Sequence, residues 1–305
     1  MSDTKIYLGI EVGDASLKVA LLDSAEKRVL RTAVLQTGTS PLDDVYTFET
    51  VLQGWLESIQ QESVEAVSLS IPAFRSVIRQ VFIPAEACAH REDYLEWYLE
   101  LITNAEKGSY IMDYQVLCGD ATVGETVLLI AVRREWVDGV RKGFRNKGLA
   151  PKTMEVDVLS LLNLMDAADH IDGLECVIKA DFAGVTLMWV SKDRLQDLRC
   201  VSTLSLVDKS AEEAYGFLAN GIHEQIDFAK EEDVSFDVKQ IHLCGELATD
   251  PLFMKNLQGA LPDYQIVLMD SFSNLRLPVE EEDSAAVLSC AGAIGAALNL
   301  MEDEV

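Results

Sequence analysis

The sequence predicts an α/β protein made of two copies of one unit, with a small α+β module inserted in the first copy. Residues 8–23, "LGIEVGDASLKVALLD", place a glycine-bearing turn between two apolar, β-rich runs. Residues 174–202, "LECVIKADFAGVTLMWVSKDRLQDLRCVS", repeat the same alternation of strand and turn. Between the two copies, residues 76–151 follow a pattern of strands and helices of their own. An internal repeat of this kind indicates a duplicated supersecondary unit.

The first copy begins with three strands joined by short turns, because its apolar residues alternate or run on between turn residues. These strands are expected at Lys5–Ile10, Leu17–Leu22 and Arg28–Val34. After Pro41, apolar residues from Phe48 to Ile59 recur at spacings of three and four, which predicts a helix. The apolar run at residues 64–72 then predicts a strand that returns to the same sheet.

The inserted module is expected to contain its own sheet and helices. Strands are predicted at residues 76–84, 110–117 and 126–132, helices at 90–104 and 135–146, and a last strand after Pro151. The helix at 90–104 carries Tyr94, Trp97 and Tyr98 at the spacing of a buried stripe, so we expect these rings in the core.

The second copy continues from its three strands into a long helix and a further strand, expected at residues 238–246. The apolar residues in phase along this helix are Tyr215, Leu218, Ile222 and Ile226. The uncharged segment Ser284–Met301 approaches the length of a membrane span, but it is rich in alanine, glycine and serine. Small residues favour a helix packed inside a protein, because their transfer into lipid is only weakly favourable.

The charge balance excludes several classes of partner. The 305-residue chain has 51 acidic and 25 basic residues, which gives a formal net charge of −26. Nucleic acids and anionic membrane surfaces are bound through clustered Lys and Arg, so we expect neither to bind directly. Any membrane association should therefore run through a protein partner.

The cysteines, the histidines and the N-terminus indicate a reduced, metal-free protein of the cytoplasm. The six cysteines occur singly and mostly in apolar runs, which is typical of buried, reduced thiols. The four histidines lack the spacing of metal ligands, so no metal site is expected. Residues 1–9 show no basic region followed by a long apolar stretch, so no signal peptide is expected.

Four segments resemble motifs of the actin-like ATPases, which hold ATP between hairpin loops of two duplicated halves. They are "YLGIEVGDASLKVALLD" for the first phosphate loop (D-x-G-S/T-x-S-x-K), "ADFAGVTLMWV" for the second, "IHLCGELATDPLFMKNLQGAL" for the adenosine segment and "DSAAVLSCAGAIGAAL" for the closing small-residue helix. Within this superfamily the chain resembles the PilM family of type IV pilus assembly proteins. The segments that carry this second resemblance are "SIPAFRSVIRQVFIP", "DYQVL", "VLLIAVRREWVDGVRKGFRNKGLAPKTMEVDVLSLLNLM" and "IDFAKE".

The resemblance implies an α/β actin-like ATPase fold with two duplicated halves. Residues 1–172 would form the first half with the module at 76–151 inserted in it, and residues 173–305 would form the second half. It also assigns a nucleotide site, whose residues would be Gly13, Asp14, Ser16, Lys18, Asp181, Gly184 and Gly245.

Several positions of that site depart from the family pattern. Glu11 replaces the family's aspartate, and Gly184 comes one residue later than the glycine of the family's second loop. Asp14 puts an acceptor-only carboxylate where a hydroxyl would donate to phosphate. Glu246 replaces a glycine that would let the backbone approach the nucleoside closely.

The nucleotide clamp is reduced as well. Few residues separate the strand near 198–206 from the long helix, where the family inserts a longer subdomain. We therefore expect ATP with magnesium to bind very weakly or not at all, and we expect no cofactor, no catalytic residue and no enzymatic activity. The alternative interpretation of Gly13 and Gly184 is that they are ordinary turn glycines.

The PilM resemblance implies a cytoplasmic scaffold of a type IV pilus or related secretion assembly platform. The inserted module and the first half would form a groove for the cytoplasmic N-terminal tail of a PilN-like bitopic membrane protein. That partner would hold the chain at the inner membrane. The acidic charge suits such a tail, because tails near membranes carry excess Lys and Arg. The resemblance leaves a homodimer open.

Two other classes of function stay open. One is a working enzyme, either a nucleotide-switched ATPase or a sugar-kinase-like protein, for which Asp181 alone is a candidate base. The other is a filament former similar to the division protein FtsA, which would need self-complementary surfaces.

Overall fold

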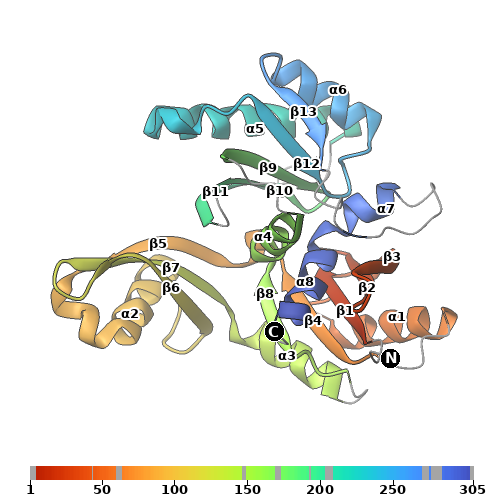
Figure 1. The fold of residues 1–305 in the computed structure, drawn as a ribbon, viewed down its shortest axis with the longest axis horizontal. Coiled ribbons are helices and arrows are strands. Elements are labelled where there is room, and N and C mark those ends of the chain that lie inside the picture. Colours follow the sequence, from red (N-terminus) through yellow and green to blue (C-terminus); the bar gives the residue numbers. More distant parts are fainter. Residues whose placement is uncertain are drawn as a thin grey trace.

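The structure is a computed structural model that describes residues 5–42, 44–59, 64–145, 149–168, 173–191, 194–202, 209–269, 275 and 284–302. Within these residues, three sheets form the framework of the chain (Figure 1). Two of them have five strands each and belong to the two halves, and the third has three strands and belongs to the inserted module.

The first sheet holds the predicted meander and two crossover strands. Its strands are β1 (Ile6–Val12), β2 (Ser16–Asp23), β3 (Arg28–Gln36), β4 (Ala66–Ile71) and β8 (Thr153–Val156). They lie in the order β3-β2-β1-β4-β8, with β1 antiparallel to β2 and parallel to β4. The predicted strands of the first copy are confirmed.

The second sheet repeats this order. Its strands are β9 (Leu174–Asp181), β10 (Gly184–Ser191), β11 (Arg194–Ser202), β12 (Gln240–Cys244) and β13 (Gln265–Leu268), in the order β11-β10-β9-β12-β13. The repeat extends to the register, because β2–β3 pairing shifts between Leu21 and Leu22 and β10–β11 pairing shifts between Trp189 and Val190. Each shift falls after the sixth residue of β2 or β10. The predicted duplication is therefore confirmed down to the position of a bulge.

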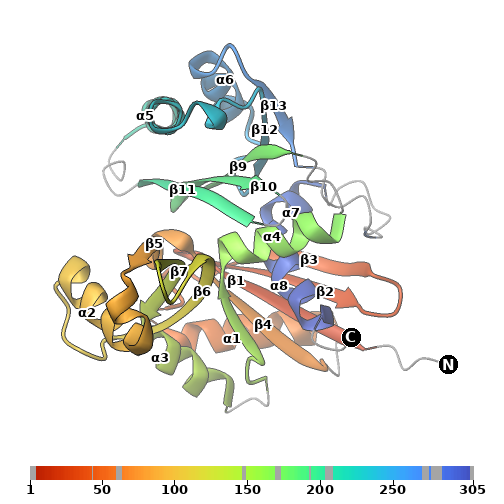
Figure 2. The same cartoon turned by 60° about the vertical axis from the view of Figure 1, so that its left-hand side comes forward.

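Helices cover the first sheet on both faces (Figure 2). They are α1 (Val45–Ser58), α3 (Arg134–Arg145), α4 (Asp157–Ala168), α7 (Ser284–Ser289) and α8 (Ala291–Glu302). α1 and α3 pack on each other through Phe48 and Phe144, whose ring centroids are 4.8 Å apart. The helix predicted after Pro41 begins at Val45.

The small-residue helix α8 is buried against β1 and α4. Its fully buried residues include Ala293, Ile294, Ala296 and Ala297. At Gly295 a Cβ would lie 1.7 Å from the carbonyl oxygen of Ser160 on α4, so glycine alone permits this approach. The expectation of a helix packed inside the protein is confirmed. Across the described ranges, every helix is too short or too polar to cross a membrane.

The inserted module is a three-stranded sheet with one long helix on it. Its strands β5 (Val77–Ile83), β6 (Tyr110–Asp120) and β7 (Gly124–Arg133) lie in the order β5-β7-β6. The helix α2 (Arg91–Thr103) packs on them through Leu95 and Leu99. The next helix, α3, packs Val137, Val140 and Phe144 into the core of the first half, and β8 joins the first sheet.

The expected buried stripe of α2 is wrong. Trp97 is 52% exposed and Leu101 is 64% exposed, while Tyr94 and Tyr98 are half-buried. The helix rests on one sheet through the face of Leu95, so the ridge that carries Trp97 faces away from that sheet.

The second sheet carries α5 (Ala211–Glu232) and α6 (Pro251–Ala260) on the face turned away from the first half (Figure 2). A capping box of Ser210 with Glu213 starts α5, and Asp250 caps α6. The in-phase residues Leu218, Ile222 and Ile226 are buried as predicted, whereas Tyr215 is half-buried. The reduced nucleotide clamp is expected between β11 and α5, and residues 203–208 of that segment lie outside the described residues.

The cysteines follow the expectation only in part. The buried ones are Cys88, Cys176, Cys244 and Cys290. Cys118 and Cys200 are exposed instead. Cys118 lies near the tip of the β6–β7 hairpin, and Cys200 lies on β11, which forms one edge of the second sheet.

Candidate functional site

A cluster of charged side chains is buried where the two halves meet. The first half supplies Glu11, Lys18 and Asp157, and the second half supplies Lys179, Asp181 and Glu246. These side chains are at most 12% exposed, and most are far less exposed than that. We call these six residues the charge cluster.

Lys18, on β2, joins the first half to the second. Its Nζ lies 3.0 Å from Glu11 Oε1 in its own half. The same Nζ lies 2.6 Å from Asp181 Oδ1 and 3.9 Å from Glu246 Oε2 in the other half. The register produces the first of these contacts, because Lys18 and Glu11 stand directly opposite each other on β2 and β1.

Lys179, on β9, makes the reciprocal connection. Its Nζ lies 2.6 Å from Asp181 Oδ2 in its own half, 2.7 Å from Glu11 Oε1 and 3.0 Å from Asp157 Oδ2. Lys179 and Asp181 are two residues apart on one strand, so their side chains leave the same face. Asp157 begins α4, and its Oδ1 accepts the backbone N–H of Ala73 at 2.9 Å.

Burial and charge act against each other on these groups. Burial alone would lower the pKa of Lys18 and of Lys179, but the charges of Asp181 and Glu11 outweigh it and raise both pKa values. Burial would raise the pKa of Asp181, but the two lysines outweigh it and lower that pKa. The lysines are therefore held charged and Asp181 is held ionised.

The other carboxyl groups respond differently. Burial raises the pKa of Asp157 and, with repulsion from Asp181 and Glu11, that of Glu246. One oxygen of Glu11, Oε2, is buried and has no hydrogen-bond partner within the described residues. The charge cluster therefore holds more carboxyl groups than its two lysines satisfy.

The structure brings some of the predicted nucleotide residues together. Lys18 and Asp181 meet in the charge cluster, and the backbone N–H of Glu246 donates to Asp181 Oδ1 at 2.9 Å. Gly245 has a φ of 98°, and a Cβ there would lie 2.4 Å from the carbonyl oxygen of Ala180. The fold itself thus requires a glycine at this position.

The hairpin residues lie outside the charge cluster's contacts. Asp14 is exposed at the tip of the β1–β2 hairpin, and its Oδ1 lies 2.5 Å from Arg75 Nη2. Gly13 and Ser16 close that hairpin, with the N–H of Gly13 donating to the carbonyl of Ser16 at 2.8 Å. Gly184 begins β10 after the corresponding turn of the second half.

Sequence reasoning missed Lys179 and Asp157. Lys179 does leave a signal, because a lysine within the apolar run of residues 176–180 needs a carboxylate partner once it is buried. Asp157 follows a strand and starts a helix, where an acidic residue also suits the helix dipole. Its pairing with a lysine of the other half leaves no trace in the local pattern.

The charge cluster satisfies its cations from within the chain. Lys18, the lysine that the phosphate loop would offer to a phosphate, is already bound by Glu11 and Asp181. A phosphate at this place would displace those pairs and leave two carboxylates beside it. The charge cluster thus forms a direct ionic contact between the two halves.

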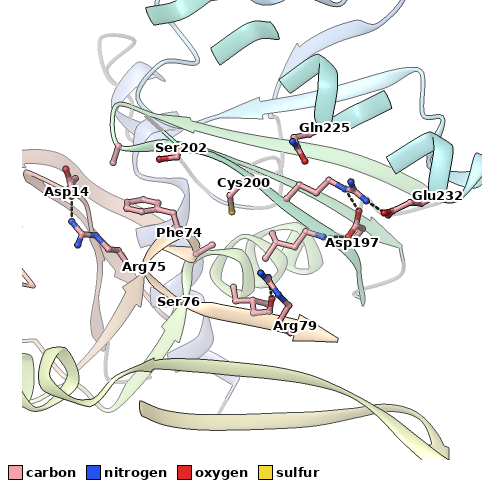
Figure 3. A pocket seen from close by; sticks show the side chains of 15 residues that line it. Asp14, Phe74, Arg75, Ser76, Arg79, Asp197, Cys200, Ser202, Gln225 and Glu232 are labelled. Carbon is pink, nitrogen blue, oxygen red and sulfur yellow. Dashed lines mark hydrogen bonds and ion pairs between the residues drawn. The ribbon is translucent and has the colours of Figure 1, made fainter. Parts of the chain in front are cut away.

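Two of the cavities in the described part of the chain bear on function. The first, which we call the edge cavity, has a volume of about 920 Å³ and lies between residues 73–79 on one side and β11 with α5 on the other (Figure 3). Its lining includes Phe74, Arg79, Leu198, Cys200, Gln225 and Glu232. The module groove, of about 440 Å³, lies between α2, the start of β6 and α3, and its lining includes Glu92, Asp93, Glu96, Glu100, Arg134 and Arg141.

Solved structures share this architecture over nearly the whole chain. The PilM–PilN type IV pilus biogenesis complex matches over 96% of this chain and 98% of that chain, with a TM-score of 0.73 and 16% identity. The cytoplasmic domain of EpsL, an inner-membrane component of the type II secretion system of Vibrio cholerae, matches over 97% and 95%, with a TM-score of 0.56 and 13% identity. A Bacteroides thetaiotaomicron protein with an actin-like ATPase fold and unknown function matches over 94% and 96%, with a TM-score of 0.51 and 12% identity.

No protein-family model and no curated protein sequence matches the chain. At the identities of the solved structures, the similarity establishes the fold. Together with the repeated sheets and their matching bulges, it shows that this chain has the actin-like ATPase fold that its sequence motifs predict.

Proposed function

We propose that this chain is a cytoplasmic, non-catalytic scaffold of a type IV pilus or related secretion platform. It would bind the cytoplasmic tail of a bitopic inner-membrane protein and reach the membrane through that partner. The observation that carries the proposal is the similarity, over nearly the whole chain, to the PilM–PilN complex. The similarity to the cytoplasmic domain of EpsL, from another inner-membrane secretion assembly, supports the same class of role.

The module groove supports a basic partner. The acidic residues that line it are Glu92, Asp93, Glu96, Glu100 and Glu106. On the opposite wall, the guanidinium of Arg134 donates to the carbonyls of Gly108 and Tyr110, at 2.7 and 3.3 Å. Cytoplasmic tails near a membrane carry excess Lys and Arg, which this acidic lining complements.

The charge cluster supports the non-catalytic part of the proposal. Lys18 and Lys179 are each bound by carboxylates of both halves, so the site supplies its own counter-charges. The exposed carboxylate of Asp14 is bound to Arg75 on the first half. These contacts support a fixed arrangement of the halves that needs no nucleotide.

The partner is tested with a synthetic peptide of the N-terminal tail of the bitopic protein encoded beside this chain. We expect calorimetric affinity to fall as ionic strength rises, because exposed charges are screened beyond about 8–10 Å at physiological salt. Asp93→Lys with Glu100→Lys reverses two charges of the groove and should weaken binding at least about tenfold.

The matched control is Glu224→Lys with Glu231→Lys, which makes the same change in net charge on exposed positions of α5. Its affinity should stay within about twofold of the wild type. Equal losses in the two double variants would show that net charge, and not the module groove, attracts the peptide. Wild-type affinity in the Asp93→Lys, Glu100→Lys variant would show that the peptide binds outside the module groove.

The nucleotide part is tested separately with ATP and magnesium. We expect calorimetry to show no binding, or a dissociation constant well above about 10 μM, which corresponds to roughly −7 kcal/mol. The double change Asp14→Ser with Glu246→Gly should leave binding absent, because Lys18 stays bound by Glu11 and Asp181. Binding by the wild type below that concentration would replace the non-catalytic scaffold with a nucleotide-switched one.

A further inference from the structure

The edge cavity lies between two strands that each form the edge of a sheet. β11 is the edge of the second sheet, and β5 is the edge of the module's sheet. Figure 3 shows the side chains of β11 on one side of the cavity and those of Phe74 to Arg79 on the other. An edge strand offers main-chain donors and acceptors to any further strand placed beside it.

The two edges converge at both ends of the cavity. At one end, Gln80 Nε2 donates to the carbonyl of Gln196 at 3.0 Å. At the other end, a Cβ added at Gly184 would lie 3.7 Å from the ring of Phe74, and Gly184 pairs with Ser202. The cavity therefore runs along residues 197–202 of β11, which span about 20 Å in an extended strand.

The register decides which main-chain groups of β11 face the cavity. The β9–β10 hairpin has a two-residue turn, so its closing pair is hydrogen-bonded and the bonds then alternate along β10. Asp197, Arg199 and Val201 consequently bond to β10, and the main-chain groups of Leu198 and Cys200 point outward. The Asp197 carboxylate accepts the N–H of Leu198 at 2.9 Å. Among the described residues, the Leu198 carbonyl and both main-chain groups of Cys200 then stay open to an added strand.

The two faces of the cavity differ in polarity. On the face of α5 lie Gln225 and Glu232, and Glu232 is bound to Arg199. On the opposite face, the apolar side chains of Phe74, Ile78 and Leu198 lie together with the polar side chains of residues 75, 76 and 79. Because the side chains of a strand alternate between faces, a strand placed here would meet polar groups and apolar groups in turn.

The lining also carries one arginine without a carboxylate. Arg75 and Arg199 are each paired with a carboxylate of this chain. Arg79 donates to the carbonyl of Ile78 at 2.8 Å and has no carboxylate partner within the described residues. It lies at the end of the cavity near Gln80, where an acidic side chain would complement it.

We propose that the edge cavity binds an extended peptide segment as an added strand along β11, with alternating apolar and polar side chains and an acidic residue at the end near Arg79. The segment belongs to a partner protein and spans about six residues. This site is separate from the module groove, so its test does not depend on the proposed function.

The first test uses a capped peptide, Glu-Val-Thr-Val-Thr-Val, and its reversed sequence. Binding covers Cys200, so alkylation of Cys200 by iodoacetamide should slow, while Cys118 on the module reports any general effect. Partial desolvation inside the cavity and the nearby Asp157 charge raise the pKa of Cys200 to about 11, so the reaction is run at alkaline pH and read by mass spectrometry. We expect at least about threefold protection of Cys200 at about 1 mM peptide, with Cys118 unchanged.

Two control peptides separate strand addition from other binding. N-methylation of alternate residues keeps the side chains but removes main-chain donors, and grouping the valines keeps the composition but removes the alternation. Neither should protect Cys200. Protection by both controls, or none by either test peptide, would overturn the proposal.

Two variants complete the test. Cys200→Pro removes one outward N–H from an edge strand, and Val34→Pro makes the same change at the equivalent residue of β3. Fluorescence anisotropy of a labelled peptide should show binding lost in the first variant and kept in the second. If Cys200→Pro does not fold, Arg79→Gln is the deciding variant. It should weaken binding of the peptide that carries Glu, and it should not change binding of the same peptide with Gln in place of Glu. Equal binding of the Glu peptide by wild type and Arg79→Gln would count against the proposal.

Discussion

The two halves share one backbone but carry opposite charges at one repeated position. Glu11 on β1 pairs with Lys18, the third residue of β2, and Lys179 on β9 pairs with Thr186, the third residue of β10. Glu11 and Lys179 are thus equivalent in the repeat, and they lie 2.7 Å apart across the interface. This change of sign at one repeated position gives the two copies an ion pair across their contact.

The hairpin tips differ in another way. The first tip carries Asp14, which is bound to Arg75, and the second carries Phe182, which is 63% exposed, and Ala183. A phosphate would need small or hydroxyl residues and open backbone amides at both tips. The repeated backbone has therefore been kept at the tips while their side chains have diverged.

The largest expected effect comes from removing the basic member of the equivalent pair. Lys179→Met leaves Glu11, Asp157 and Asp181 buried with one lysine fewer, so the free energy of unfolding should fall by about 3–5 kcal/mol. Urea denaturation followed by circular dichroism measures this change. Adding Glu11→Gln should recover part of the loss, because one unpaired carboxylate is then gone.

The matched control is an exposed lysine with a single partner. Lys239 is 75% exposed and lies 3.1 Å from Asp237. Lys239→Met should lower the free energy of unfolding by less than about 1 kcal/mol, because water screens such a pair. Similar losses for the two lysines would show that the charge cluster does not join the halves.

A smaller effect is expected where helices α4 and α8 cross. Gly295→Ala drives a Cβ toward the Ser160 carbonyl and should lower the free energy of unfolding by about 1–3 kcal/mol. Gly259→Ala, on α6 of the second half, meets nothing within 4 Å and should raise it by up to about 1 kcal/mol. Thermal denaturation compares the stabilities of the two variants. An unchanged stability of Gly295→Ala would mean that α4 and α8 can move apart to accommodate the added methyl group.

The smallest expected effect concerns Glu246. Burial raises the pKa of Glu246 above the ordinary 4.5, so the folded protein binds this proton more tightly than the unfolded chain does. The stabilisation that results is full below pH 4.5 and is lost as the pH rises through the raised pKa of Glu246. Glu246→Gln should therefore be more stable than wild type at pH 7, and the difference should narrow toward pH 5. The exposed substitution Glu224→Gln should show no such trend. A gain that does not change with pH would have another cause.

The sequence predicted the sheets better than it predicted what covers them. Alternation and turn residues located the strands of both copies except the short edge strand β13, Gln265–Leu268, because those signals are local. The period of α2 located the helix but not its covered face, so Trp97 was placed in the core and is exposed. Cys200 is exposed for a similar reason, since its strand is apolar but lies at an edge.

The site was predicted only where a motif marked it. Lys18 and Asp181 stand at motif positions, and the structure brings them to 2.6 Å. Lys179 lies on the same strand as Asp181, but Asp157 starts a helix of the other half, so Lys179 and Asp157 meet only once the halves are packed. Charge pairing between distant segments depends on how the two halves pack against each other, and no local sequence pattern predicts that packing.

The position of α8 along the chain has a consequence for synthesis. This helix, residues 291–302, packs on β1 and α4 of the first half, although the second sheet and its helices α5 and α6 precede it in translation. A ribosome that has finished residues 5–168 has therefore made every strand of the first sheet but not the helix that covers β1. The nascent first half must keep that apolar face from aggregating until α8 emerges. Chaperone dependence in this protein should thus be greatest in the interval between those two points.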